Sequence, residues 1–174
     1  MSTIRIACAA LLLCLASFAQ AQLTTSQVAT LRTTCQADIG CAALAAAADD
    51  IGLAAWLNSV DATCTVWRSD VTVLEVNKVM VWTEIDALTV GKARIWDWMS
   101  RLGVLDAREA NIRQGLSDGF SAATATRTAL IALAKRAPTR AERALASGAC
   151  TSGSPSIMTF VGLVTYAEAS LIRS

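Results

Sequence analysis

Histidine is absent from the sequence. Its absence removes the most common general base of enzymes and the commonest nitrogen ligand of metal ions. The chain also has no C-x-x-C pair and no S-x-x-K element that could supply a Ser-Lys nucleophile. Carboxylates alone could still support a hydrolase or transferase, but no spacing singles out two of them. We therefore expect no enzymatic activity, no metal site and no cofactor.

Proline and charged residues are scarce. The 174 residues include two prolines, and 17% are charged whereas 54% are hydrophobic. This composition suits a folded domain with a hydrophobic core, and the abundant alanine favours helices. We predict a mainly α fold, a compact bundle of short helices. The β-prone stretches around residues 65–71 and 157–164 are compatible with an additional small two-stranded β element.

Helix starts are marked by a recurrent local pattern. A threonine stands three residues before a glutamate or glutamine, at the head of an apolar-periodic stretch. In such a capping box the threonine accepts from a free backbone N–H, and the residue three positions later reaches back. The helices predicted in this way begin after Thr24, Thr72, Thr139 and Thr165. Asp106, which also precedes a glutamate by three residues, predicts a further start.

The N-terminal segment differs from the rest of the chain. Arg5 precedes an apolar run that ends in the small residues Ala19-Gln20-Ala21. This layout is typical of a secretory signal peptide, and it predicts cleavage after Ala21. An uncleaved anchor is the alternative, although the run is short for a span of about 20 residues. We expect residues 1–21 to be a signal peptide, residues 22–174 to be a single helical domain, and membrane contact only through an uncleaved signal.

Four cysteines remain beyond the signal segment: Cys35, Cys41, Cys64 and Cys150. An even number in an exported chain indicates two disulfides, for which four cysteines allow three pairings. Free thiols are the alternative, and zinc is disfavoured because the spacings are wide and histidine is missing. The cysteines therefore predict a location outside the cytoplasm, in the periplasm or in a virion.

The stretch "LTVGKARIWDWMSRLG" (88–103) raises the question of a nucleotide or nucleic-acid site. A phosphate loop needs a glycine five positions before the Gly-Lys pair and a Ser or Thr after it, where this chain has Asp86 and Ala93. On a helical wheel the tryptophans and arginines point to opposite sides, so they cannot line one groove for bases and phosphates. We expect neither a nucleotide nor a nucleic acid as a partner.

The same helix is expected to pack its aromatic side inward. The predicted inner face consists of Ile95, Trp96, Trp98, Met99 and Leu102. All five tryptophans lie within residues 56–98. We predict that they pack as one buried cluster.

Positive charge gathers in the second half of the chain, opposite an acidic first half. Five of these cations form a possible basic patch for an acidic partner: Arg127, Lys135, Arg136, Arg140 and Arg143. Ordinary exposed cations on two amphipathic helices are the alternative. The charge asymmetry is also compatible with head-to-tail association of copies, or with the two halves folding onto each other.

Six stretches resemble a family of small uncharacterised proteins of tailed bacteriophages and prophages. They are "LTTSQVATLR", "VWRSDVTVLEV", "LTVGKARIWDWM", "ANIRQGLSDGFS", "LAKRAPTRAERALASG" and "SPSIMTFVGLVTY", in family order over most of residues 23–166. The resemblance implies a non-enzymatic structural or interaction protein, a minor virion or tail-associated component that binds phage structural proteins or copies of itself. It supplies no functional residues. This chain departs from the family by its export signal and its cysteines, which instead favour an exported periplasmic or envelope-acting protein, such as a lysis accessory.

Overall fold

The computed structural model describes residues 23–120 and 124–174, so the predicted signal peptide lies outside the described residues. The predicted mainly α class with a small β element is confirmed. The helices are α2 (Thr25–Ala37), α3 (Ile39–Ala46), α4 (Asp50–Asn58), α5 (Val73–Val79), α6 (Trp82–Asp86), α7 (Val90–Ser100), α8 (Ala110–Gly119), α9 (Ala125–Leu133), α10 (Arg140–Leu145) and α11 (Tyr166–Arg173). The strands are β1 (Val66–Trp67), β2 (Val71–Thr72), β3 (Val104–Leu105) and β4 (Lys135–Arg136). No helix in the described ranges is long and apolar enough to cross a membrane.

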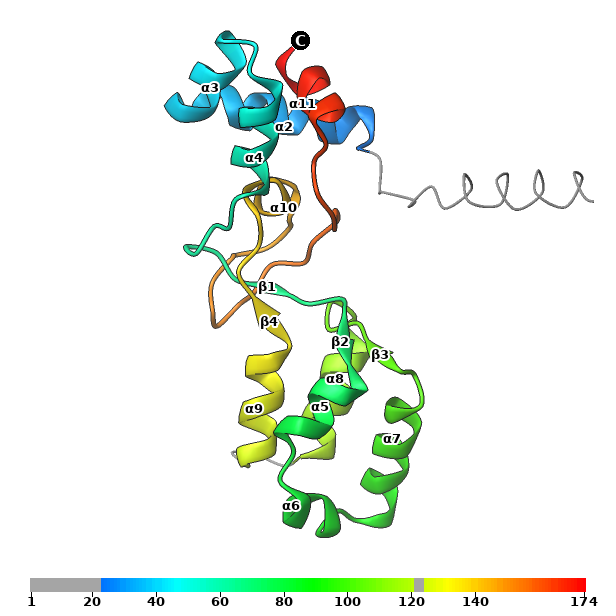
Figure 1. Ribbon diagram of the computed structural model, residues 1–174. Coiled ribbons are helices and arrows are strands. Elements are labelled where there is room, and N and C mark those ends of the chain that lie inside the picture. Colours follow the sequence, from blue (N-terminus) through cyan, green and yellow to red (C-terminus); the bar gives the residue numbers. More distant parts are fainter. Residues whose placement is uncertain (1–22, 121–123) are drawn as a thin grey trace, which may run out of the picture.

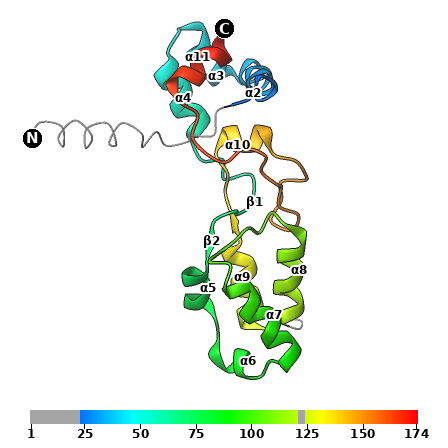
Figure 2. The same cartoon turned by 90° about the vertical axis from the view of Figure 1, so that its right-hand side faces the viewer.

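The helices form two groups at opposite ends of an elongated molecule (Figure 1). Helices α2, α3, α4, α10 and α11 pack on one another as the terminal lobe, whereas α5 to α9 form the inserted lobe. Viewed from the side, the two lobes remain separate, with β1 between them (Figure 2). The chain thus leaves the terminal lobe, builds the inserted lobe, and returns to complete the first.

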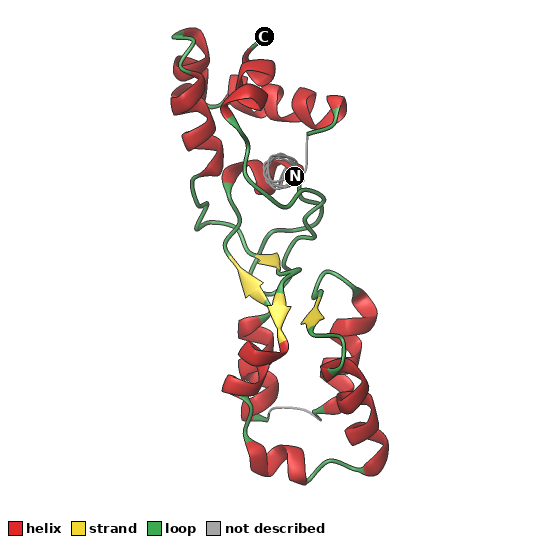
Figure 3. Cartoon of the chain, turned by 45° about the vertical axis from the view of Figure 1, so that its right-hand side comes forward, coloured by secondary structure: helices red, strands yellow, loops and turns green. Residues whose placement is uncertain are grey.

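The strands lie at the junction of the two lobes (Figure 3). Antiparallel pairing joins β1 to β4, and a second antiparallel pair joins β2 to β3. Strands were expected near residues 65–71, where β1 and the start of β2 lie, but their expected partner was segment 157–164. That neighbourhood contributes only isolated bridges, from Ser156 to Val66 and from Ile157 to Ser147. Strand propensity does not indicate which strand a segment will pair with, because pairing depends on how the chain folds in three dimensions.

The hydrophobic core is divided in the same way as the helices. One cluster, around Leu31, Leu53 and Leu57, fills the terminal lobe. A second cluster, around Met99 and Phe120, fills the inserted lobe. A small third cluster of Cys64, Val66 and Met158 lies at the junction. Two lobes with separate cores therefore share one narrow connection.

The capping pattern locates four of the ten helix starts in the described residues. Capping boxes form at Thr24, Thr72, Thr139 and Thr165, each with the predicted residue three positions later. The start predicted from Asp106 was wrong. Its carboxylate pairs with Arg108 instead, and α8 begins four residues later without a side-chain cap. The Asp106 carboxylate accepts from the guanidinium and the backbone N–H of Arg108, two residues on, and so caps no helix N-terminus.

The expected tryptophan cluster does not form. Trp82 and Trp98 are 64% and 59% exposed, and the other three indoles belong to separate environments. Trp56 packs on the core of the terminal lobe, Trp96 meets Phe120 edge-on in the inserted lobe, and Trp67 lies under two cations. Tryptophans close in sequence were separated because the chain crosses between lobes within this segment.

The inner face predicted for α7 is only partly buried. Met99 is buried and Trp96 half-buried, but Ile95, Trp98 and Leu102 are 43%, 59% and 45% exposed. Helix α7 lies at the edge of its lobe and packs mainly on α8. One neighbouring helix covers a narrower arc than the apolar face that the sequence provides.

Both predicted disulfides are present, and the structure selects one of the three pairings. Cys35 pairs with Cys41 within the terminal lobe, and Cys64 pairs with Cys150 at the junction. The Cα atoms of each pair are 5.0 Å apart, a normal disulfide spacing. Two disulfides are compatible with an extracytoplasmic location.

Candidate functional site

The five cations predicted as a basic patch occupy three settings. Arg127 and Lys135 line a cavity between the inserted lobe and the junction. Arg140 and Arg143 line another cavity in the terminal lobe. Arg136 pairs with a buried glutamate. The five side chains therefore line two separate cavities and contribute to one ion pair.

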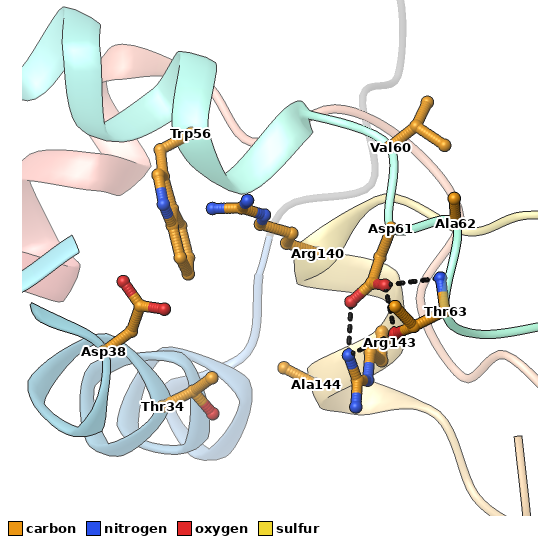
Figure 4. A pocket seen from close by; sticks show the side chains of 10 residues that line it. All are labelled: Thr34, Asp38, Trp56, Val60, Asp61, Ala62, Thr63, Arg140, Arg143 and Ala144. Atoms are coloured by element: carbon orange, nitrogen blue, oxygen red, sulfur yellow. Dashed lines mark hydrogen bonds and ion pairs between the residues drawn. The ribbon is translucent and has the colours of Figure 1, made fainter. Parts of the chain in front are cut away.

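The larger of these two cavities, of about 580 Å³, opens where α2, α4 and α10 approach the segment that follows α4 (Figure 4). Two of the helices that form its walls begin at caps encoded in the local sequence. Helix α4 begins at the cap formed by Asp49, and α10 begins at the capping box of Thr139. Backbone hydrogen bonds from Arg140 to Ser59 and from Asp61 to Pro138 tie α10 to the end of α4. The two helices are thus held at a fixed separation, and their side chains face one space.

Arg140 is the cation best placed to bind a ligand in this cavity. Its guanidinium carbon lies 4.3 Å from the centroid of the Trp56 ring, which is the geometry of a cation–π contact. Across the described ranges, Arg140 is absent from the ion pairs that acidic side chains form. The Trp56 indole therefore orients the Arg140 guanidinium, and the N–H groups of the guanidinium remain available to a ligand.

Asp61, Thr63 and Arg143 form a fixed polar cluster at the opposite wall (Figure 4). The Thr63 hydroxyl and backbone N–H donate to Asp61 Oδ1 over 2.6 and 2.9 Å. Arg143 pairs with the other carboxylate oxygen and donates to Thr63 Oγ1 over 3.0 Å. The Thr63 hydroxyl, followed by Arg143, lowers the pKa of Asp61 to about 2. Asp61 is consequently an ionised, fully engaged carboxylate at neutral pH.

This arrangement suits recognition of an anionic group. Asp61 is held ionised by its hydrogen bonds, so it is poorly suited to exchange protons near neutral pH. The described residues contain no group of three or more acidic, cysteine or histidine side chains that could hold a metal ion. Arg140, by contrast, offers a planar set of donors that matches a carboxylate or phosphate. Binding is what the geometry of this cavity supports.

The pH dependence of stability provides a test of the Asp61 cluster. A carboxylate whose pKa is lowered by folding stabilises the folded state above its unfolded pKa of about 4, and the contribution disappears as pH falls toward 2. With allowance for solvent screening, we expect Asp61→Asn to cost about 1 kcal/mol at pH 7 and almost nothing near pH 2. Urea denaturation of both proteins across this range measures the difference. Asp97→Asn, which alters an exposed ion pair, is the matched control. An equal cost of Asp61→Asn at pH 7 and at pH 2 would contradict the lowered pKa of Asp61.

Sequence reasoning found only part of this cavity. It selected Arg140 and Arg143 as cations but placed Trp56 in a buried cluster and gave Asp61 no role. One local signal was available for Asp61, since an aspartate two residues before a threonine favours an Asx turn, which the Thr63 N–H completes. Nothing local predicts that Trp56 stacks on Arg140, because 84 residues separate them.

No family model, no curated protein and no solved structure matches this chain. The resemblance to phage proteins therefore stays a prediction.

Proposed function

We propose that this protein is a non-enzymatic interaction protein that docks onto a protein partner through Arg140 and Trp56. The observation that carries the proposal is the stacked Arg140 guanidinium, which has no carboxylate partner among the described residues and lines a cavity of about 580 Å³. Arginine and tryptophan are the residues most enriched at the energetic centres of protein interfaces. The partner should insert an aspartate or glutamate, whose carboxylate can accept two N–H groups of Arg140.

The proposed partner is a structural protein of a phage particle, and this protein would be a minor virion or tail-associated component. The sequence resemblance supports that choice, and the disulfides support an assembly exposed to an oxidising environment. An exported protein that acts in the periplasm or at the cell envelope is the second candidate. It is favoured by the predicted signal peptide and by the same disulfides.

The test compares particles made with the natural chain and with Arg140→Ala. Mass spectrometry of purified particles from the producing strain should detect peptides of residues 22–174. We expect Arg140→Ala to lower their abundance by about tenfold or more, as loss of a central arginine costs about 2 kcal/mol or more of binding. Arg140→Lys should also bind poorly, because an ammonium lacks the planar fork of donors.

Arg101→Ala is the matched control, since Arg101 is 74% exposed on the other lobe. Thermal melts of all variants check that they fold. Particles free of the natural chain, together with a periplasmic chain that starts at Gln22, would favour the second candidate. Particles that carry natural and Arg140→Ala chains equally would reject Arg140 as the docking residue.

A further inference from the structure

A second cavity, of about 470 Å³, lies between α8, α9 and the β1–β4 pair. Its lining holds three cations, Arg113, Arg127 and Lys135, together with Trp67. No acidic residue contributes to this lining. The cavity therefore differs from the Arg140 cavity, where the carboxylates of Asp38 and Asp61 balance the positive charge of the lining.

Each of the three cations is held in place by a neutral group. Arg113 Nη1 donates to two backbone carbonyls, over 2.7 and 2.6 Å, and Arg127 Nη2 donates to Ser117 Oγ over 3.0 Å. Lys135 Nζ donates to the Ser152 carbonyl over 2.7 Å. In the part of the chain that the structure describes, none of them belongs to an ion pair with a carboxylate. Three oriented like charges thus face one space without a counter-charge.

Trp67 adds an aromatic surface to this positive site. The Arg113 guanidinium carbon and Lys135 Nζ lie 5.1 and 5.2 Å from the centroid of its ring. The ring therefore positions two of the three cations. Apolar side chains complete the cavity: Leu116, Leu130, Ile131 and Ala134. The site thus combines a cationic region with an apolar wall, within the size range of small-molecule pockets.

We infer that this cavity binds a small organic anion, a phosphate-type head group attached to an apolar body. The head would take N–H donors of Arg127 and Lys135, and the body would lie against Trp67 and the apolar wall. Like charges held together without a counter-ion destabilise the folded protein, and such an arrangement is typical of a binding site. This inference is independent of docking through Arg140.

Calorimetric titration of the full protein with n-hexyl phosphate tests the site. We expect hexyl phosphate to bind more tightly than inorganic phosphate, which lacks the apolar body, and more tightly than hexanol, which lacks the charge. Arg127→Gln and Lys135→Gln should each weaken binding by about tenfold or more, because each removes a charge-assisted hydrogen bond. Arg101→Gln, at an exposed position just after α7, should leave the binding of hexyl phosphate unchanged. The inference would be overturned if hexyl phosphate did not bind, or if both variants bound it as tightly as the natural protein does.

A stability measurement separates loss of the site from loss of the fold. Arg127→Gln/Lys135→Gln removes mutual repulsion, so its melting temperature without ligand should equal or exceed that of the natural protein. A clearly lower melting temperature would show that these cations stabilise the fold and would count against the inference. Vesicles of phosphatidylglycerol identify the source of the anion: competition with hexyl phosphate indicates a lipid, and binding of hexyl phosphate alone indicates a soluble ligand.

Discussion

Replacement of both Cys64 and Cys150 by serine is expected to lower the free energy of unfolding by about 4 to 5 kcal/mol. The two cysteines are 86 residues apart, and the segment between them contains the whole inserted lobe. A covalent link over so long a loop removes many conformations of the unfolded chain, so its loss makes unfolding more favourable. Urea denaturation of the oxidised natural protein and of the double variant measures the change.

The other disulfide is the matched control. Cys35 and Cys41 are separated by only 6 residues. Their replacement by serine should cost about 2 kcal/mol on the same loop-entropy argument. Cys35, Cys41 and Cys64 are buried and Cys150 is half-buried, so the introduced hydroxyls cost the Cys35/Cys41 variant at least as much as the Cys64/Cys150 variant. Equal losses for the two pairs would show that local packing, rather than loop length, determines the stabilisation.

Glu142→Ala is expected to destabilise the protein by about 3 to 5 kcal/mol. The Glu142 side chain is 3% exposed and accepts from both terminal nitrogens of Arg136, over 2.8 and 2.6 Å. It also accepts from the Thr139 N–H over 2.8 Å, which completes the cap of α10. Its removal leaves the Arg136 charge without its partner at the junction of the lobes. Chemical denaturation of the purified variant gives the cost.

Two comparisons identify the origin of that cost. Asp97→Ala breaks an exposed pair with Arg101 and should change stability by no more than about 0.5 kcal/mol. Glu142→Ala combined with Arg136→Met should recover part of the loss, because the unpaired, half-buried charge of Arg136 is then gone. If the double variant is as unstable as Glu142→Ala, the lost stability comes from the helix cap and not from the unpaired charge.

The candidate sites illustrate what local patterns can provide. The sequence marks Arg127, Lys135 and Arg140 as cations available for a partner, since their residue types and spacing are visible directly. It does not show that Arg140 lies on Trp56, or that Arg113 joins Lys135 at Trp67. These neighbours come from different helices and strands, and only the return of the chain through β4 brings them together.

The sequence by itself determined the helical class, the four helix starts with capping boxes and the availability of four cysteines for two disulfides. A capping box needs residues only three positions apart, so no distant part of the chain has to be known. Tertiary structure alone decided the division into two lobes, the pairing of β1 with β4, the choice among three disulfide pairings and the exposed side of α7. These features depend on which distant segments meet, and the free energy of such contacts is shared among many residues of both partners.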